Sequence, residues 1–110
     1  MCQFKNLTPH AICVLDMEGV EHTFQPDPQG PARVSVRTET LPATAGFRLQ
    51  QQAFGQVENL PKAEDGVVLI VSALVLAQCK ERADLVAPDT GRDAIRNEAG
   101  QVVAVRGFVR

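Results

Sequence analysis

GVVLIVSALVLAQCKERADLVAP, residues 66–88, is the stretch that determines the fold. Its first part, 67–71, is an uninterrupted run of aliphatic and largely β-branched residues, which is typical of a strand buried on both faces. Such a strand belongs in the middle of a sheet. Ser72 follows as a natural N-cap, and 73–82 is predicted to form a helix of about three turns whose solvated end carries Lys80, Glu81 and Arg82.

A second apolar run at 85–87 comes after this helix and stops at Pro88. The order strand, helix, strand favours a βαβ unit with parallel strands, because about a dozen residues are close to the shortest crossover that a parallel pair allows. An antiparallel return of 85–87 is the alternative.

The flanking segments predict further strands and turns. The 25–31 segment, QPDPQGP, carries three prolines and a glycine and is predicted to be a loop. The 32–40 segment alternates Val34 and Val36 with Arg33, Ser35 and Arg37, which predicts a half-buried strand with its basic side outward. The other expected elements are a hairpin over 11–24, a strand within 47–55 or 56–60 after the poorly patterned 41–46, and a closing hairpin over 94–109. Residues 1–110 are therefore expected to form a single α+β domain, mostly β-sheet with hairpins and one main helix.

Composition excludes several classes of protein. An apolar fraction of 45% and a charged fraction of 22% are those of an ordinary globular protein rather than a disordered one. A net charge of -2 and the lack of Tyr and Trp argue against binding of long nucleic acids. The three cysteines have no metal-ligand spacing, and no segment has the length of a membrane span or the pattern of a signal peptide. We therefore expect a cytoplasmic protein with no metal, no cofactor and no membrane contact.

The polar segment DLVAPDTGRDAIR, residues 84–96, contains the first group of candidate site residues. If 67–71 and 85–87 are parallel neighbours, Ser72 and the loop after Pro88 emerge at the carboxyl edge of one sheet, where open α/β sheets bind ligands. Free amides at the start of the helix would favour an anion there. The predicted contacts are phosphate for Arg92 and Arg96, and sugar hydroxyls for Asp89 and Thr90.

The alternative for this segment is a simple turn. In that case the Asp89 side chain bonds its own backbone, Gly91 supplies a positive φ, and the two arginines are exposed strand ends.

NLTPH, residues 6–10, is the second polar cluster. Asn6 and Thr8 can cap a turn that Pro9 makes rigid. His10 could donate a hydrogen bond to a phosphate or serve as a general base, or it could be purely structural. No acidic partner at a recognisable spacing supports a hydrolase. Ser72 lacks the flanking glycines of a nucleophile elbow, and the glycine-rich phosphate loops of known nucleotide-binding motifs are absent.

The blocks NLTPHAI, PARV, IVSALV, DLVAPDTGRDAIR and GQVVAVRGF cover much of the chain. In these blocks the sequence resembles an uncharacterised family of small bacterial and bacteriophage proteins. The resemblance implies a protein of the bacterial host cytoplasm, and it carries over no catalytic residue.

These observations predict non-enzymatic binding or sequestration of a phosphate-bearing small molecule, a nucleotide, with Asn6, Thr8, His10, Ser72, Asp89, Thr90, Arg92 and Arg96 as ligand-binding residues. A bacteriophage anti-defence protein that captures a host nucleotide immune signal would fit this description. Because so small a chain encloses a nucleotide most easily between subunits, we expect a homo-oligomer. The alternatives are a small phosphoryl- or glycosyl-processing enzyme that uses His10, and a protein-interaction module.

Overall fold

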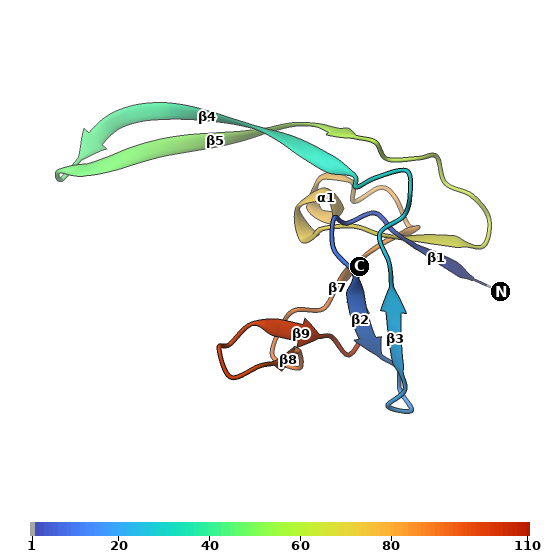
Figure 1. The fold of residues 1–110 in the computed structure, drawn as a ribbon. Helices are drawn as coiled ribbons and strands as arrows, with labels where there is room; N and C mark the ends of the chain where they lie inside the picture. Colours follow the sequence, from blue (N-terminus) through green and yellow to red (C-terminus); the bar gives the residue numbers. More distant parts are fainter. Residues whose placement is uncertain (1) are drawn as a thin grey trace.

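The computed structural model describes residues 2–110 as a small sheet with three hairpins attached to it (Figure 1). The four-stranded sheet has the order β1-β6-β7-β10, and the two-stranded hairpins are β2–β3, β4–β5 and β8–β9. The chain is mostly strand with one short helix, as the sequence predicts. The elements are β1 (Gln3–Asn6), β2 (Ile12–Leu15), β3 (Glu21–Phe24), β4 (Arg33–Thr44), β5 (Phe47–Glu58), β6 (Val67–Ile70), α1 (Ala73–Gln78), β7 (Leu85–Pro88), β8 (Ile95–Arg96), β9 (Val102–Ala104) and β10 (Phe108–Val109).

The predicted βαβ unit is confirmed. Strand β6 lies between β1 and β7 and is parallel to both, with Ile70 next to Asn6 on one side and next to Val86 on the other. Leu69, Ile70 and Val71 are buried, as expected for a central strand. Strand β10 closes the sheet by pairing antiparallel with β7. The sheet is therefore parallel over three strands and has one antiparallel edge.

Both faces of this sheet are covered. Helix α1 packs on one face, where a buried cluster includes Leu69, Val71, Val75 and Leu85. On the other face three phenylalanine rings from distant parts of the chain lie together: Phe4 stacks on Phe108 with their centroids 5.4 Å apart, and the tilted ring of Phe24 lies 5.7 Å from Phe4. The three aromatic side chains are half-buried and form an apolar cluster on this face.

The helix is shorter than predicted. It spans Ala73–Gln78, six residues, and ends where the Cys79 backbone N–H donates to the Leu76 carbonyl. Arg82 was expected at a solvated helix end, but it lies partly buried beyond the helix and forms two hydrogen bonds with Asp84. This ion pair and the burial of Cys79 turn the chain back toward β7, which overrides the helix propensity of 79–82.

The longest hairpin, β4–β5, projects from the body as an arm (Figure 1). The molecule measures 52 × 38 × 23 Å with a radius of gyration of 16.6 Å, whereas a compact chain of this length has about 13 Å. Only Val34 and Val57, at the base of the arm, pack against the core cluster. The prediction of a half-buried strand over 32–40 is therefore wrong beyond Val34, since almost all of β4 past this point is exposed.

The turn at the tip of the arm also differs from expectation. Residues 41–44 continue β4, and the chain reverses at Ala45 and Gly46, which both have positive φ (52° and 82°). Two consecutive positive φ angles give the turn a twist that suits a two-residue hairpin. The sequence did not reveal this turn because Pro42 interrupts the strand pattern. The pairing of β4 with β5 is irregular at this point, between Leu41 and Thr44.

The other two predicted hairpins are present. Strands β2 and β3 pair over their full lengths, and β8 pairs with β9. Val105, which follows β9, connects the β8–β9 hairpin to the β2–β3 hairpin through two hydrogen bonds. Its N–H donates to the Cys13 carbonyl and its carbonyl accepts from the Leu15 N–H. The chain then enters β10 rather than ending in the hairpin.

Candidate functional site

The parallel strands bring three polar loops to one edge of the sheet. The registers align Asn6 with Ile70 and Ile70 with Val86. Thr8, Ser72 and Pro88 stand two residues beyond these three aligned positions. Neighbouring strands of a sheet lie about 4.8 Å apart. The loops 7–11, 71–73 and 89–94 therefore leave the sheet at the same carboxyl edge, which we call the rim. The convergence of Ser72 with the loop after Pro88 follows from the parallel pairing, as the sequence predicts.

The first rim loop is organised by Asn6, which is 2% exposed. Its Nδ2 donates to the carbonyls of His10 and Phe24, both at 2.8 Å. Its Oδ1 accepts from the Thr8 backbone N–H at 3.0 Å and from the Thr8 hydroxyl at 2.6 Å. An amide side chain can make four good hydrogen bonds, and here all four are made within the protein. Asn6 and Thr8 thus shape the loop that carries His10.

His10 lies at the end of this loop with an exposed side chain. Its backbone carbonyl is held by Asn6, while its imidazole makes no hydrogen bond or ion pair within residues 2–110. The imidazole nitrogens are therefore available to a ligand.

Ser72 is the N-cap of α1, as predicted: its hydroxyl oxygen accepts from the Val75 backbone N–H at 3.2 Å. A helix of only six residues adds a weaker dipole than the three-turn helix that was expected. Anion binding at the rim would therefore depend on the side chains of the loops more than on the helix.

The third rim loop begins as a turn closed by Asp89. Its Oδ1 accepts from the Gly91 backbone N–H at 3.1 Å, and its own N–H donates to the Gly107 carbonyl at 3.0 Å. Gly91 does not have the positive φ that the turn interpretation assigned to it. A side-chain bond two residues along the chain closes this turn without a left-handed residue. Thr90 is exposed, and its hydroxyl makes no hydrogen bond among the described residues.

The two candidate phosphate ligands differ in their surroundings. The Arg96 guanidinium donates to the carbonyls of Gly100 at 2.9 Å and Thr90 at 3.3 Å, so it braces the loop. Arg92 is exposed and has no side-chain hydrogen bond or ion pair within the described chain. Arg92 is therefore the better placed of the two for a bidentate contact with a phosphate.

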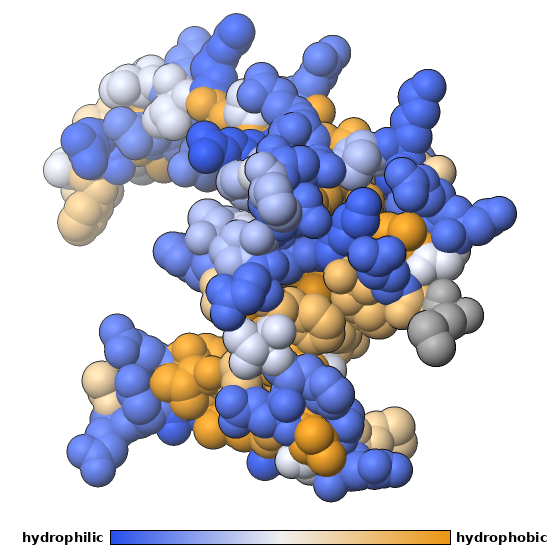
Figure 2. All heavy atoms as spheres, turned by 45° about the vertical axis from the view of Figure 1, so that its right-hand side comes forward, coloured by the Kyte–Doolittle hydropathy of each residue, from blue (hydrophilic) through white to orange (hydrophobic). Residues whose placement is uncertain are grey.

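A shallow groove of about 180 Å³ opens beside the rim. Thr90 and Pro88 line one side of it, and β2 and β9 line the rest. Val102 and Val103 of β9 are 37% and 52% exposed there. Figure 2 shows apolar side chains gathered over this lower part of the molecule, beneath a deep indentation that separates it from the arm. The groove combines an apolar wall with one polar side chain of the rim loops, that of Thr90. The other candidate residues, His10, Ser72, Arg92 and Arg96, do not line it.

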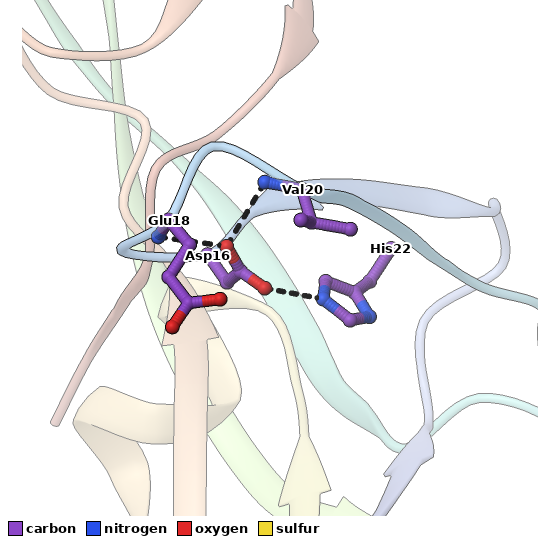
Figure 3. Close-up of polar contacts among 4 residues, drawn as sticks. All are labelled: Asp16, Glu18, Val20 and His22. Carbon is purple, nitrogen blue, oxygen red and sulfur yellow. Dashed lines mark hydrogen bonds and ion pairs between the residues drawn. The ribbon is translucent and has the colours of Figure 1, made fainter.

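A second group of residues was not identified from the sequence. An open groove of about 330 Å³ is lined by the three clustered phenylalanines, Arg106 and His22. His22 Nε2 lies 2.8 Å from Asp16 Oδ2, and Asp16 Oδ1 accepts from the backbone N–H groups of Glu18 and Val20 (Figure 3). The sequence marked His22 only as a surface residue of a strand. The pairing with Asp16 could have been found from the hairpin register, which places His22 opposite Val14 and so diagonally across from Asp16, two residues further along on the same face.

The Asp16 contacts predict a pH dependence of stability. The hydrogen bond from His22, followed by the backbone N–H of Val20, lowers the pKa of the Asp16 carboxyl. A group whose pKa is lower in the folded state stabilises the fold above its unfolded pKa, and this contribution is lost as the pH falls through the folded pKa. We expect Asp16→Asn to remove that part of the acid sensitivity. Urea unfolding at about pH 6 and about pH 3 measures it.

Glu18→Gln is the matched control, because Glu18 contributes only its backbone N–H to the turn. Equal losses of stability on acidification in Asp16→Asn and in the unmodified protein would contradict the assignment.

Comparisons of the chain with protein-family models, curated proteins and solved structures found no match. Within residues 2–110, no three His, Cys, Asp or Glu side chains come together in an arrangement that could hold a metal ion. The same residues contain no helix with the length and hydrophobicity needed to cross a membrane.

Proposed function

We propose that the protein binds and sequesters a phosphate-bearing small molecule, a nucleotide, at the rim. The observation that carries the proposal is the parallel order of β1, β6 and β7, which gathers three polar loops at one carboxyl edge. That edge is where sheets of this kind bind ligands.

The side chains of the rim suggest a division of roles. Arg92 is unpaired within the described chain and would bind phosphate, with His10 as a second donor. The Thr90 hydroxyl would bind a sugar hydroxyl beside the apolar groove. Asn6, Thr8, Asp89 and Arg96 would hold the loops in position, since their side chains are bonded to the protein itself.

The size of the groove favours a ligand shared between subunits. One copy offers about 180 Å³, whereas sites for small molecules of nucleotide size occupy about 300–1,000 Å³. A second copy of the chain would supply the missing wall. The proposed active form is therefore a homo-oligomer.

The class of ligand that we propose is a host nucleotide signal. The proposal draws on the resemblance to small bacterial and bacteriophage proteins, because a phage protein that captures such a signal in the host cytoplasm would blunt immunity without catalysis. Cyclic dinucleotides, cyclic ADP-ribose isomers and NAD are the first compounds to test.

Thermal unfolding with each compound tests the proposal. A ligand at 100 times its dissociation constant adds about 2.7 kcal/mol to the free energy of unfolding, which raises Tm by roughly 10 °C or more for a chain of this size. We expect Arg92→Ala to abolish most of that rise, while Arg48→Ala, which removes an exposed arginine near the tip of the arm, leaves it intact. No rise with any compound, or equal rises in Arg92→Ala and the unmodified protein, would contradict the proposal.

Chromatography of the released ligand separates sequestration from catalysis. Sequestration returns the compound intact after the protein is denatured. Turnover that His10→Ala abolishes would instead support the phosphoryl- or glycosyl-processing enzyme.

A further inference from the structure

Beyond its base, the arm exposes two long strand edges that nothing within residues 2–110 covers. Each strand of β4–β5 is twelve residues long, and β4 and β5 pair only with each other. In an antiparallel pair, alternate residues of each strand direct their backbone N–H and C=O groups away from the partner strand. An isolated two-stranded ribbon is marginal in water, so an arm of this length requires a further strand or surface to pack against.

The two edges are not alike. Strand β4 carries Arg33, Arg37, Glu39 and, near its end, Pro42. Charged residues and proline are the features that protect a strand from pairing at the edge of a sheet. Strand β5 has neither from Leu49 to Val57, nine residues in succession without a charge or a proline. By these criteria β4 is an outer strand and β5 is an inner strand whose neighbour is missing.

We propose that β5 pairs antiparallel with β5 of a second copy of the chain, over residues 49–54. The result is a four-stranded sheet that spans both molecules, with the two β4 strands as its charged outer edges. The segment ends at Phe54 because the pairing of β4 with β5 becomes irregular just beyond it. Val36 pairs with Phe54, whereas Val34 pairs with Val57, so the register shifts at this point.

The chemistry of the edge favours a second copy over another partner. A two-fold axis places the same segment opposite itself in reverse direction. For LQQQAF, residues 49–54, this brings no like charges together, and the three glutamines can hydrogen-bond through their amide groups to one another. The same operation on β4 would leave Pro42 without a donor in the new interface.

Several exposed apolar side chains lie on the arm. Phe54 is 43% exposed, and its partner in the register, Val36, is 47% exposed. Leu49 is 44% exposed. Side chains of this size gain most from burial when the arm is covered by another surface. The pairing needs no ligand, so it holds or fails independently of nucleotide binding.

The register of the arm offers a matched pair of variants. Gln50 lies opposite Thr40, and Gln52 lies opposite Thr38. Two double variants therefore match: Gln50→Lys/Gln52→Lys on β5 and Thr38→Lys/Thr40→Lys on β4. Both add two lysines at the same positions along the arm and on the same face, and they differ only in the strand that carries the lysines. We expect the β5 variant to raise the dissociation constant of the dimer at least about tenfold, because it sets four lysines around the two-fold axis. The β4 variant should change the constant by less than about threefold.

Light scattering over a dilution series of the full chain measures both constants. Circular dichroism shows whether each variant is folded. Hydrogen exchange gives a second measurement on the unmodified protein: the amides of 49–54 that point away from β4 should lose protection on dilution, whereas amides of β4 should not. A monomer at all concentrations, equal effects of the two variants, or outward-facing β5 amides whose exchange is independent of concentration would overturn the proposal.

Discussion

Asn6→Ala is expected to lower the free energy of unfolding by about 3 kcal/mol, equivalent to a fall in Tm of roughly 15 °C. The Asn6 side chain is buried and makes four hydrogen bonds, to the backbone of Thr8, His10 and Phe24 and to the Thr8 hydroxyl. Alanine removes all four and leaves the carbonyls of His10 and Phe24 without that donor. Each buried group left unpaired costs about 1–3 kcal/mol, and entry of water offsets part of the sum.

Asn97→Ala is the matched control for this prediction. Asn97 also closes a turn, since its Oδ1 accepts from the backbone N–H groups of Ala99 and Gln101, but it is exposed. Water can replace the hydrogen bonds that alanine removes there, so we expect a loss below about 1 kcal/mol. Urea unfolding of the two variants measures the difference. Similar midpoints for both would show that burial does not give Asn6 its importance.

The same substitution bears on the candidate site. NLTPH, residues 6–10, has two interpretations, a ligand-binding cluster and a capped turn. The first requires the Asn6 side chain to be free for a ligand, and the second requires it to bond to the backbone. The hydrogen bonds favour the second for Asn6 and Thr8, while the exposed imidazole of His10 keeps the first open for that residue. A sequence shows that an asparagine stands near a histidine. It does not show whether the amide is already saturated by backbone groups from β3, eighteen residues away.

Central features of the fold could be predicted because they depend on local pattern. The largely β-branched run at 67–71 can be buried on both faces only in the middle of a sheet, and the crossover through Ser72 and α1 favours a parallel neighbour because it is just long enough for one. Once these two strands are parallel, the placement of Ser72 and the loop after Pro88 at one edge follows. The addition of β1 to the same parallel set could not be foreseen, because FKN gives no sign of which strand it will join.

The remaining features depend on contacts between distant residues. The helix ends early because Arg82 bonds to Asp84 and to the Pro61 carbonyl, which lies 21 residues away. The sequence of the 32–40 segment does not distinguish an exposed arm from a strand of the body. Alternation of apolar and polar residues does not reveal whether the apolar side packs against the core of its own chain. Val34 packs against the core cluster, whereas Val36, two residues later on the same side of β4, is half exposed.

Asp84→Ala is expected to lower the free energy of unfolding by about 2 kcal/mol at neutral pH. Arg82 Nε donates to Asp84 Oδ1 at 2.9 Å and its Nη2 donates to Oδ2 at 2.8 Å. The side chains of Arg82 and Asp84 are only 22% and 14% exposed, so alanine would leave a largely buried guanidinium without its counter-charge. Asp84 also immediately precedes β7, and its carbonyl accepts from the Leu69 N–H, so the loss falls on the βαβ unit itself.

The sign of the pH dependence provides a second test of this pair. The hydrogen bonds from Arg82 lower the pKa of the Asp84 carboxyl. The stabilisation is therefore present above the unfolded pKa, about 3.9, and disappears as the pH falls through the folded value. The difference in stability between Asp84→Ala and the unmodified protein should shrink in acid, while the control Glu81→Ala, which removes an exposed neighbouring acid, should show little difference at either pH.

A double-mutant cycle isolates the interaction between the two side chains. If Arg82 and Asp84 act mainly through each other, Arg82→Ala/Asp84→Ala should cost less than the sum of the single variants by at least about 1 kcal/mol. Strict additivity would mean that the two side chains do not stabilise the fold through each other and that Arg82 acts through the Pro61 carbonyl alone. The early end of α1 would then follow from the burial of Cys79 and not from the ion pair.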